Sequence, residues 1–265
     1  MTIAPGETCY TLGAASCSGV GLVWTQAELD NAIAGPVAAL VFDDAGAANL
    51  AALLGSVADT EFAQDELTRV LQPSADIENW RVGEAIAESY LLDHRGCSFP
   101  WPDGRDERKS GSSLPGADLV GFHKQGGGDR FTFGEVKTSG EATYPPQTMY
   151  GRYGLIQQLE DLRDNVYLRN DLVKYLGHRA AAAPWQEQYR AAGRRYLANS
   201  HDVQLFGVLV RDVPPHQDDL RTRVERLATG RPDGTGIEML CIYLPATSID
   251  SLAPTTLATR AGGGP

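Results

Sequence analysis

The stretch GADLVGFHKQGGGDRFTFGEVKTSG, residues 116–140, decides how this sequence is expected to fold. Apolar residues dominate positions 118–123 and 130–137, and three glycines at 126–128 supply a turn, so we expect two antiparallel strands. Asp118 then lies at the start of one strand, with Glu135 and Lys137 at the end of its neighbour. Because Glu135 and Lys137 are two residues apart, their side chains point to the same face of the sheet. The three charges therefore meet at one edge, where they are costly unless solvated or functional.

These residue types suit a magnesium site. Asp118 and Glu135 are hard oxygen ligands, and two carboxylates with water make a typical Mg²⁺ site. A cation held by both carboxylates polarises a phosphate, while Lys137 holds or activates a water for in-line attack. The non-functional interpretation is that Asp118 caps a loop and that Glu135 and Lys137 form a solvated pair at the sheet edge.

The spacing GAD-x16-EVK on adjacent strands resembles the PD-(D/E)XK superfamily, the restriction-endonuclease-like nucleases. Ala117 stands where many members carry a proline before the aspartate. The resemblance implies that Asp118, Glu135 and Lys137 are catalytic residues, and that Asp118 and Glu135 bind Mg²⁺, with Mn²⁺ as a substitute.

The resemblance also implies an acidic residue on an upstream helix, which we expect over residues 76–93. Glu84 and Glu88 lie four apart on one face of that helix. We expect Glu84 to be a further catalytic residue and metal ligand, because Gly83 leaves room for close approach, with Glu88 as the alternative. Many members carry a glutamine in the helix after the lysine strand, and Gln157 or Gln158 is expected in that place.

Two groups of basic side chains are candidates for contacting DNA phosphates. One group is in a polar loop and the other in a helix that begins near residue 184. A solvated loop and an arginine-rich surface helix are the respective alternatives. The candidates are Arg105, Arg108 and Lys109 in the loop, and Arg190, Arg194 and Arg195 in the helix.

The rest of the chain predicts an α/β fold. Residues 203–213 and 237–245 are apolar enough for interior strands, and a short strand is expected at 97–101. Helices are expected from residue 147, from residue 184 and over 218–228. This order fits a mixed central β-sheet flanked by helices, and the resemblance implies a restriction-endonuclease-like core.

Residues 1–72 are expected to form a small acidic α/β subdomain before a nuclease domain over 73–260 and a disordered tail at 261–265. Its elements are a helix at 25–33, a strand at 37–44 and helices at 50–54 and 61–71. Residues 1–70 carry a net charge of −8 out of −11 for the whole chain, which leaves −3 elsewhere. Such a concentration predicts a docking face for a protein partner, a gate that repels DNA, or merely a solubilising surface.

Composition excludes several other classes. The hydrophobic fraction of 42% is ordinary for a globular protein, and no apolar run of 18 residues or secretory leader is apparent, so we expect a cytoplasmic protein without a membrane partner. The four cysteines and five histidines lack metal-ligand spacing. No phosphate-binding loop or serine-nucleophile motif is present.

The sequence thus predicts a Mg²⁺-dependent endonuclease that hydrolyses phosphodiester bonds of DNA. Nucleases of the kind that it resembles serve restriction and defence against phage in bacteria, and no stand-alone recognition domain is visible, so we expect a protein partner to supply target choice. The alternative is a catalytically silent nuclease-fold protein that acts as a binding or adaptor subunit.

Overall fold

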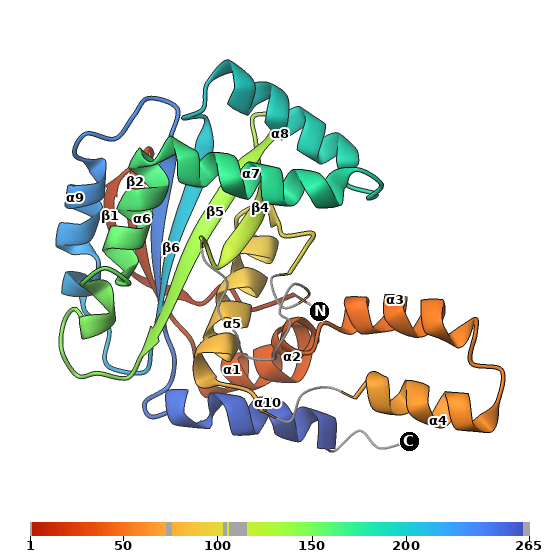
Figure 1. The fold of residues 1–265 in the computed structure, drawn as a ribbon. Coiled ribbons are helices and arrows are strands. Elements are labelled where there is room, and N and C mark those ends of the chain that lie inside the picture. Colours follow the sequence, from red (N-terminus) through yellow and green to blue (C-terminus); the bar gives the residue numbers. More distant parts are fainter. Residues whose placement is uncertain (1, 73–75, 103–104, 106–115, 262–265) are drawn as a thin grey trace.

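The computed structural model describes residues 2–72, 76–102, 105 and 116–261. Seven strands form one sheet in the order β1-β2-β7-β6-β5-β4-β3, with helices on both faces (Figure 1). The predicted α/β fold with a mixed sheet flanked by helices is confirmed. The strands are β1 Glu7–Ala14, β2 Cys17–Val23, β3 Cys97–Ser98, β4 Leu119–Gln125, β5 Gly128–Ser139, β6 Val203–Arg211 and β7 Gly236–Tyr243.

The predicted hairpin is β4 and β5, which pair antiparallel from Gln125 and Gly128 at the turn to Leu119 and Gly134. On its other side β5 pairs parallel with β6, and β6, β7 and β2 continue in parallel. Every residue of β6 is buried, as expected for an interior parallel strand. Because β4 begins opposite Gly134, the last five residues of β5 extend beyond it.

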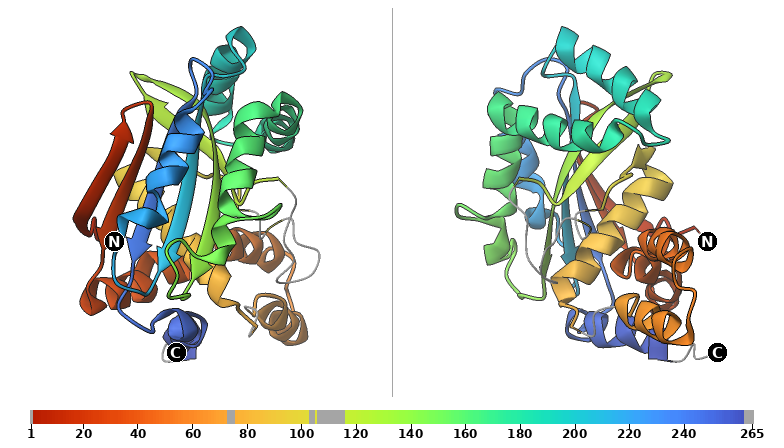
Figure 2. Two further views of the ribbon diagram at one scale, coloured as in Figure 1. Left: turned by 90° about the vertical axis from the view of Figure 1, so that its left-hand side faces the viewer. Right: turned by 45° about the vertical axis from the view of Figure 1, so that its right-hand side comes forward.

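Two helical layers cover the sheet (Figure 2). Because successive side chains of a strand point to opposite faces, each residue of β5 faces one of these layers. Val136 packs in the core with α5, while Phe131 and Phe133 pack in the opposite core with α6 to α9. Glu135 and Lys137 are two and four residues after Phe133, so their side chains point to the same face of the strand, which is the α6 side. One layer contains α1 Gln26–Ala32, α2 Ala38–Val41, α5 Asn79–His94 and α10 Leu252–Ala261; the other contains α6 Leu155–Asp164, α7 Val166–Ala180, α8 Gln186–Ala198 and α9 Arg221–Ala228.

The acidic N-terminal segment differs from its prediction. The strand predicted at residues 37–44 is wrong, because a π-helical turn at Ile33–Val37 continues into α2. A short apolar run cannot be distinguished from a buried helix by its pattern alone, and Val37 is fully buried against the α5 layer. The strands of this segment are instead β1 and β2, which belong to the central sheet. A domain boundary after residue 72 stays a prediction, because residues 73–75 lie outside the described part of the chain.

The helices α3 Asp44–Gly55 and α4 Glu61–Val70 form an arm that extends away from the sheet (Figure 1). Neither helix contains a buried residue. No single helix in the described ranges has the length and apolar character needed to cross a membrane. The tail predicted to be disordered at 261–265 lies outside the described residues from position 262 onward.

Gly83 of α5 packs directly against Thr138 of β5. A Cβ atom at this position would lie 1.9 Å from Thr138 Oγ1 and 3.2 Å from Thr138 Cβ. We expect Gly83→Ala to lower the free energy of unfolding by about 1–3 kcal/mol, because β-branched Thr138 has few rotamers to retreat to. Chemical denaturation measures this loss.

The matched control is Gly193→Ala in the interior of α8, where a Cβ meets no atom within 4 Å. This variant should be neutral or more stable by up to about 1 kcal/mol. Equal destabilisation by both substitutions would contradict the importance of the contact with Thr138.

Candidate active site

The hairpin brings Asp118, Glu135 and Lys137 together. Asp118 immediately precedes β4, and its Oδ2 accepts a 2.7 Å hydrogen bond from the Val136 amide. Lys137 Nζ lies 3.4 Å from Glu135 Oε2 and 4.0 Å from Asp118 Oδ2. One ammonium group therefore faces two carboxylates, all on the α6 side of the sheet.

Glu135 is the most unusual of the three, because its side chain is only 1% exposed. Burial raises the pKa of its carboxyl to about 9, the charge of Asp118 adds to the rise, and Lys137 partly offsets it. Glu135 Oε1 is buried and has no hydrogen-bond partner among the described residues. A buried acceptor without a partner is costly, so this oxygen is suited to a ligand that supplies positive charge.

The donor set fits a divalent cation held by the carboxylates of Asp118 and Glu135 with water in the remaining positions. No third ligand joins them in the part of the chain that the structure describes. Within those residues, no group of three or more histidine, cysteine, aspartate or glutamate side chains is placed to hold a metal. The fit therefore rests on two carboxylates and on the unpartnered Glu135 oxygen.

Glu84 lies on α5, which packs against the face of β5 opposite to Glu135. The neighbouring Val82 belongs to the core on that opposite face. Glu84 Oε2 lies 3.7 Å from Arg81 Nη1, and the side chain is 19% exposed. Glu88, one turn later, interacts electrostatically with Arg105. A metal-binding role for Glu84 stays a prediction.

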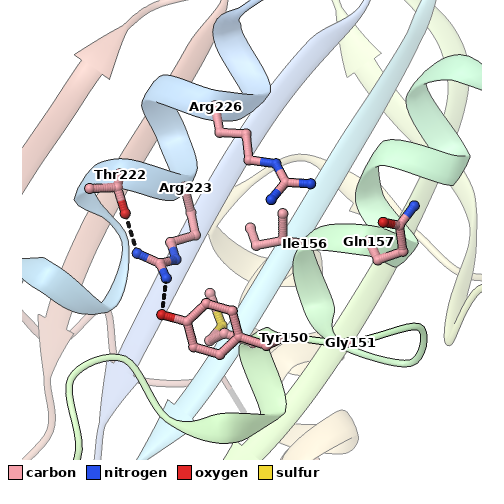
Figure 3. Close-up of a pocket in the computed structure, with 8 residues that line it drawn as sticks. Tyr150, Gly151, Ile156, Gln157, Thr222, Arg223 and Arg226 are labelled. Atoms are coloured by element: carbon pink, nitrogen blue, oxygen red, sulfur yellow. Dashed lines mark hydrogen bonds between the residues drawn. The ribbon is translucent and has the colours of Figure 1, made fainter.

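The two glutamines of α6 differ in their surroundings. Gln157 donates a 3.0 Å hydrogen bond to Asp161 and lines a pocket between α6 and α9 (Figure 3). On the same side of α6, Glu160 pairs with Arg226 of α9. Gln158 lies on the other flank of the helix, and its buried Oε1 has no partner among the described residues. An accessory role for either glutamine stays a prediction.

The described candidates for contacting DNA lie on two different elements. Arg105 makes a bidentate ion pair with Asp43, with both distances 2.7 Å, beside the start of α3. Arg195, on α8, makes a bidentate pair with Asp202. Arg190 pairs with Glu187 and remains half exposed, Arg194 is exposed, and Arg108 and Lys109 lie outside the described residues.

Sequence reasoning did not single out Arg211, which ends β6 and is fully buried. Its Nη1 donates to the Ser139 carbonyl at 3.1 Å and its Nη2 to the Thr143 carbonyl at 2.9 Å. These bonds fix the chain that leaves β5 two residues after Lys137. The available signal was a charged residue at the end of the apolar run VQLFGVLVR.

No protein-family model matches the chain, and no curated protein matches it. Any assignment of function therefore depends on the site itself.

The raised pKa of Glu135 predicts a pH-dependent effect on stability. Its ordinary pKa is 4.5 and its folded value is about 9, so its contribution to stability is complete below about pH 4.5 and is lost as pH rises toward 9. Over that range the unfolded chain ionises while the folded carboxyl keeps its proton. In the presence of a chelator, Glu135→Gln should therefore be more stable than the wild type by on the order of 2 kcal/mol near neutral pH and by almost nothing near pH 4.

Urea denaturation across this pH range provides the measurement. Glu225→Gln is the control, because Glu225 is exposed on α9 and forms no ion pair with another described residue, so its substitution should not reproduce the pH-dependent difference. A Glu135→Gln difference that stays constant with pH would contradict the proposed origin of the shift.

Proposed function

We propose that this protein is a Mg²⁺-dependent endonuclease that hydrolyses phosphodiester bonds of DNA, as the effector of a bacterial restriction or anti-phage system. The observation that carries the proposal is the buried carboxyl group of Glu135 with an unpartnered oxygen, beside Asp118 and Lys137. Strongly perturbed carboxyl groups next to a specific charge partner are frequent at active sites.

The residues divide the chemistry among them. Asp118 and Glu135 would hold the cation, which when bound neutralises the carboxylates and polarises a phosphate oxygen. The Val136 amide orients the Asp118 carboxylate through its 2.7 Å hydrogen bond. Lys137 Nζ carries three donors, so it can hold a water or a phosphate oxygen while it contacts both carboxylates.

The order of elements supports the same proposal. A helix that carries Glu84 precedes the hairpin, the Glu-Val-Lys strand follows Asp118, and the glutamine-bearing α6 leads to a further parallel strand, β6. This is the order that the resemblance to PD-(D/E)XK nucleases implies. A silent binding subunit is the alternative, and the two-carboxylate donor set of the described residues is the observation that favours it.

A protein partner is the second part of the proposal, and the α3–α4 arm is its candidate docking site. Asp59, Glu61, Asp65 and Glu66 give the arm a negative surface, so a partner with a basic surface would complement it. The arm and the turn between its helices also hold most of the exposed large apolar side chains of the described residues: Leu50, Leu53, Val57, Phe62 and Val70.

Cleavage of a plasmid tests the enzymatic part. With Mg²⁺ or Mn²⁺ the wild type should cleave DNA, and Ca²⁺ should not support turnover, because its looser geometry misplaces the attacking water. Asp118→Asn, Glu135→Gln and Lys137→Ala should each lower the rate by about 100-fold or more. Circular dichroism should show that each variant is folded.

Lys124→Ala is the matched control, because Lys124 is exposed on β4 near the opposite end of the hairpin. Its rate should equal that of the wild type. Activity within about threefold of the wild type in the Lys137→Ala variant, or cleavage that persists in excess chelator, would refute the assignment. Folded wild-type protein without any cleavage would favour the silent binding subunit.

If the arm docks a protein partner, replacing its four acidic residues by the corresponding amides (Asn or Gln) should abolish co-purification of a basic protein from the native host. The affinity for DNA should not change. The control neutralises Asp171 and Glu187, which are equally exposed on α7 and α8. A gain in DNA affinity that shrinks at high salt would instead identify the arm as an electrostatic gate. No change in either measurement would leave the arm a solubilising surface.

A further inference from the structure

The turn between β5 and α6 presents two exposed tyrosines. Tyr150 is 48% exposed and Tyr153 is 76% exposed. An arginine lies over each ring: the Arg223 guanidinium carbon is 4.9 Å from the centroid of Tyr150, and that of Arg152 is 5.7 Å from the centroid of Tyr153. Aromatic rings interleaved with arginines on one surface are suited to stacked bases and their phosphates.

The turn is held in a fixed shape. The Tyr150 amide donates to the Gln147 carbonyl, and the Gly154 amide donates to the Gly151 carbonyl, both at 3.0 Å. A Cβ at Gly154 would lie 2.2 Å from the Tyr150 carbonyl oxygen, so only glycine fits at this position. The rings therefore sit on a preorganised turn, which reduces the entropy cost of binding a ligand.

Tyr150 and Arg223 border the pocket between α6 and α9, which has a volume of about 270 Å³ (Figure 3). Met149 and Ile156 provide apolar surface in this pocket, and Thr222 adds a hydroxyl. The Arg223 guanidinium donates to the Tyr150 and Thr222 hydroxyls, which are neutral groups. A pocket that combines apolar and polar surface with a cation suits a flat base attached to a phosphate.

The charges of this surface differ from those of the chain as a whole. Arg226 is neutralised by Glu160, and Arg221 by Asp218. Arg152 and Arg223, in contrast, form no ion pair with a carboxylate in the part of the chain that the structure describes. In a chain with a net charge of −11, these two arginines supply local positive charge on the α6 side of the sheet, where Lys137 also lies.

We infer that the turn and pocket formed by Tyr150, Arg152, Tyr153 and Arg223 bind single-stranded DNA on the same side of the sheet as the candidate active site. Bases stacked inside a duplex cannot reach a tyrosine ring or enter a pocket, whereas unpaired bases can do both. A duplex also carries a denser line of phosphates than a single strand, which a protein with a net charge of −11 accommodates poorly. The inference rests on the proposed nuclease function and specifies its substrate.

Fluorescence anisotropy of the full chain in a chelator, which prevents cleavage, tests the inference. The probes are a labelled oligodeoxythymidylate and a duplex of the same length. The single strand should bind at least about tenfold more tightly than the duplex. The double variant Tyr150→Ala/Tyr153→Ala should lose at least about tenfold in affinity for the single strand, and Tyr153→Phe should retain it. Arg223→Gln should reduce the slope of log affinity against log salt by about 0.7.

Tyr167→Ala is the matched control, because Tyr167 is 78% exposed on α7, away from the turn. Its affinity should equal that of the wild type, and thermal melting should show every variant folded. Equal binding of the duplex, or a double variant that binds like the wild type, would overturn the inference.

Failure of the proposed DNA-binding surface and failure of the proposed nuclease activity give different results. Tyrosine-dependent binding of the single strand without cleavage in Mg²⁺ would refute the nuclease and leave the surface established. Cleavage that requires Lys137 but is indifferent to both tyrosines, with either substrate, would refute the surface and leave the nuclease established.

Discussion

The hydrogen bond from the Val136 amide to Asp118 is the interaction on which the rest of the candidate site depends. β4 ends its pairing with β5 at Leu119 and Gly134, and no strand of the described residues pairs with that edge of β5 beyond this point. The Asp118 carboxylate takes the place of the missing strand by accepting from Val136 at 2.7 Å. A buried amide without an acceptor would be costly, so the Val136 amide holds the Asp118 carboxylate in place. The negative charge of Asp118 is thereby fixed next to the residues on either side of Val136. Those residues are Glu135 and Lys137, which share the opposite face of the strand.

This arrangement conflicts with stability and therefore suggests a function. The Glu135 side chain lies beside Asp118 and is only 1% exposed, so its ionised form is disfavoured. Lys137 is the partner of both acidic groups, at 3.4 Å from Glu135 and 4.0 Å from Asp118. A structural ion pair would not require two acidic groups for one base, nor leave Glu135 Oε1 unpartnered. Natural proteins keep such locally unfavourable groups mainly where binding or catalysis uses them. The energetic cost of the site is thus itself part of the argument for a bound cation.

Much of the sheet could be predicted because the motif strands combine apolar runs with strong turn signals. The expected strands at 118–123 and 130–137 correspond to β4 and β5, and the runs at 203–213 and 237–245 correspond to β6 and β7. β1 and β2 were missed because β1 is an edge strand without a buried face and β2 contains two glycines, which have low strand propensity. The structure gives the reason for those residues: a Cβ at Gly19 would lie 2.7 Å from Val224 of α9, so close packing between layers overrides propensity. The proximity of Asp118, Glu135 and Lys137 followed from strand geometry, whereas the burial of Glu135 depends on α6 and the neighbouring strands, which local sequence does not reveal.

The two faces of β5 have different roles, and this difference restricts where a substrate can approach. On the α5 side, Gly83 lies against Thr138 so closely that no added atom fits between them. On the α6 side, the strand presents Glu135 and Lys137 and then continues into a chain anchored by the buried Arg211. A phosphodiester that reaches Lys137 must therefore approach from the α6 side. The turn that carries Tyr150 follows that anchored chain and leads directly into α6, so the geometry of β5 ties the position of the candidate catalytic residues to that of the aromatic surface.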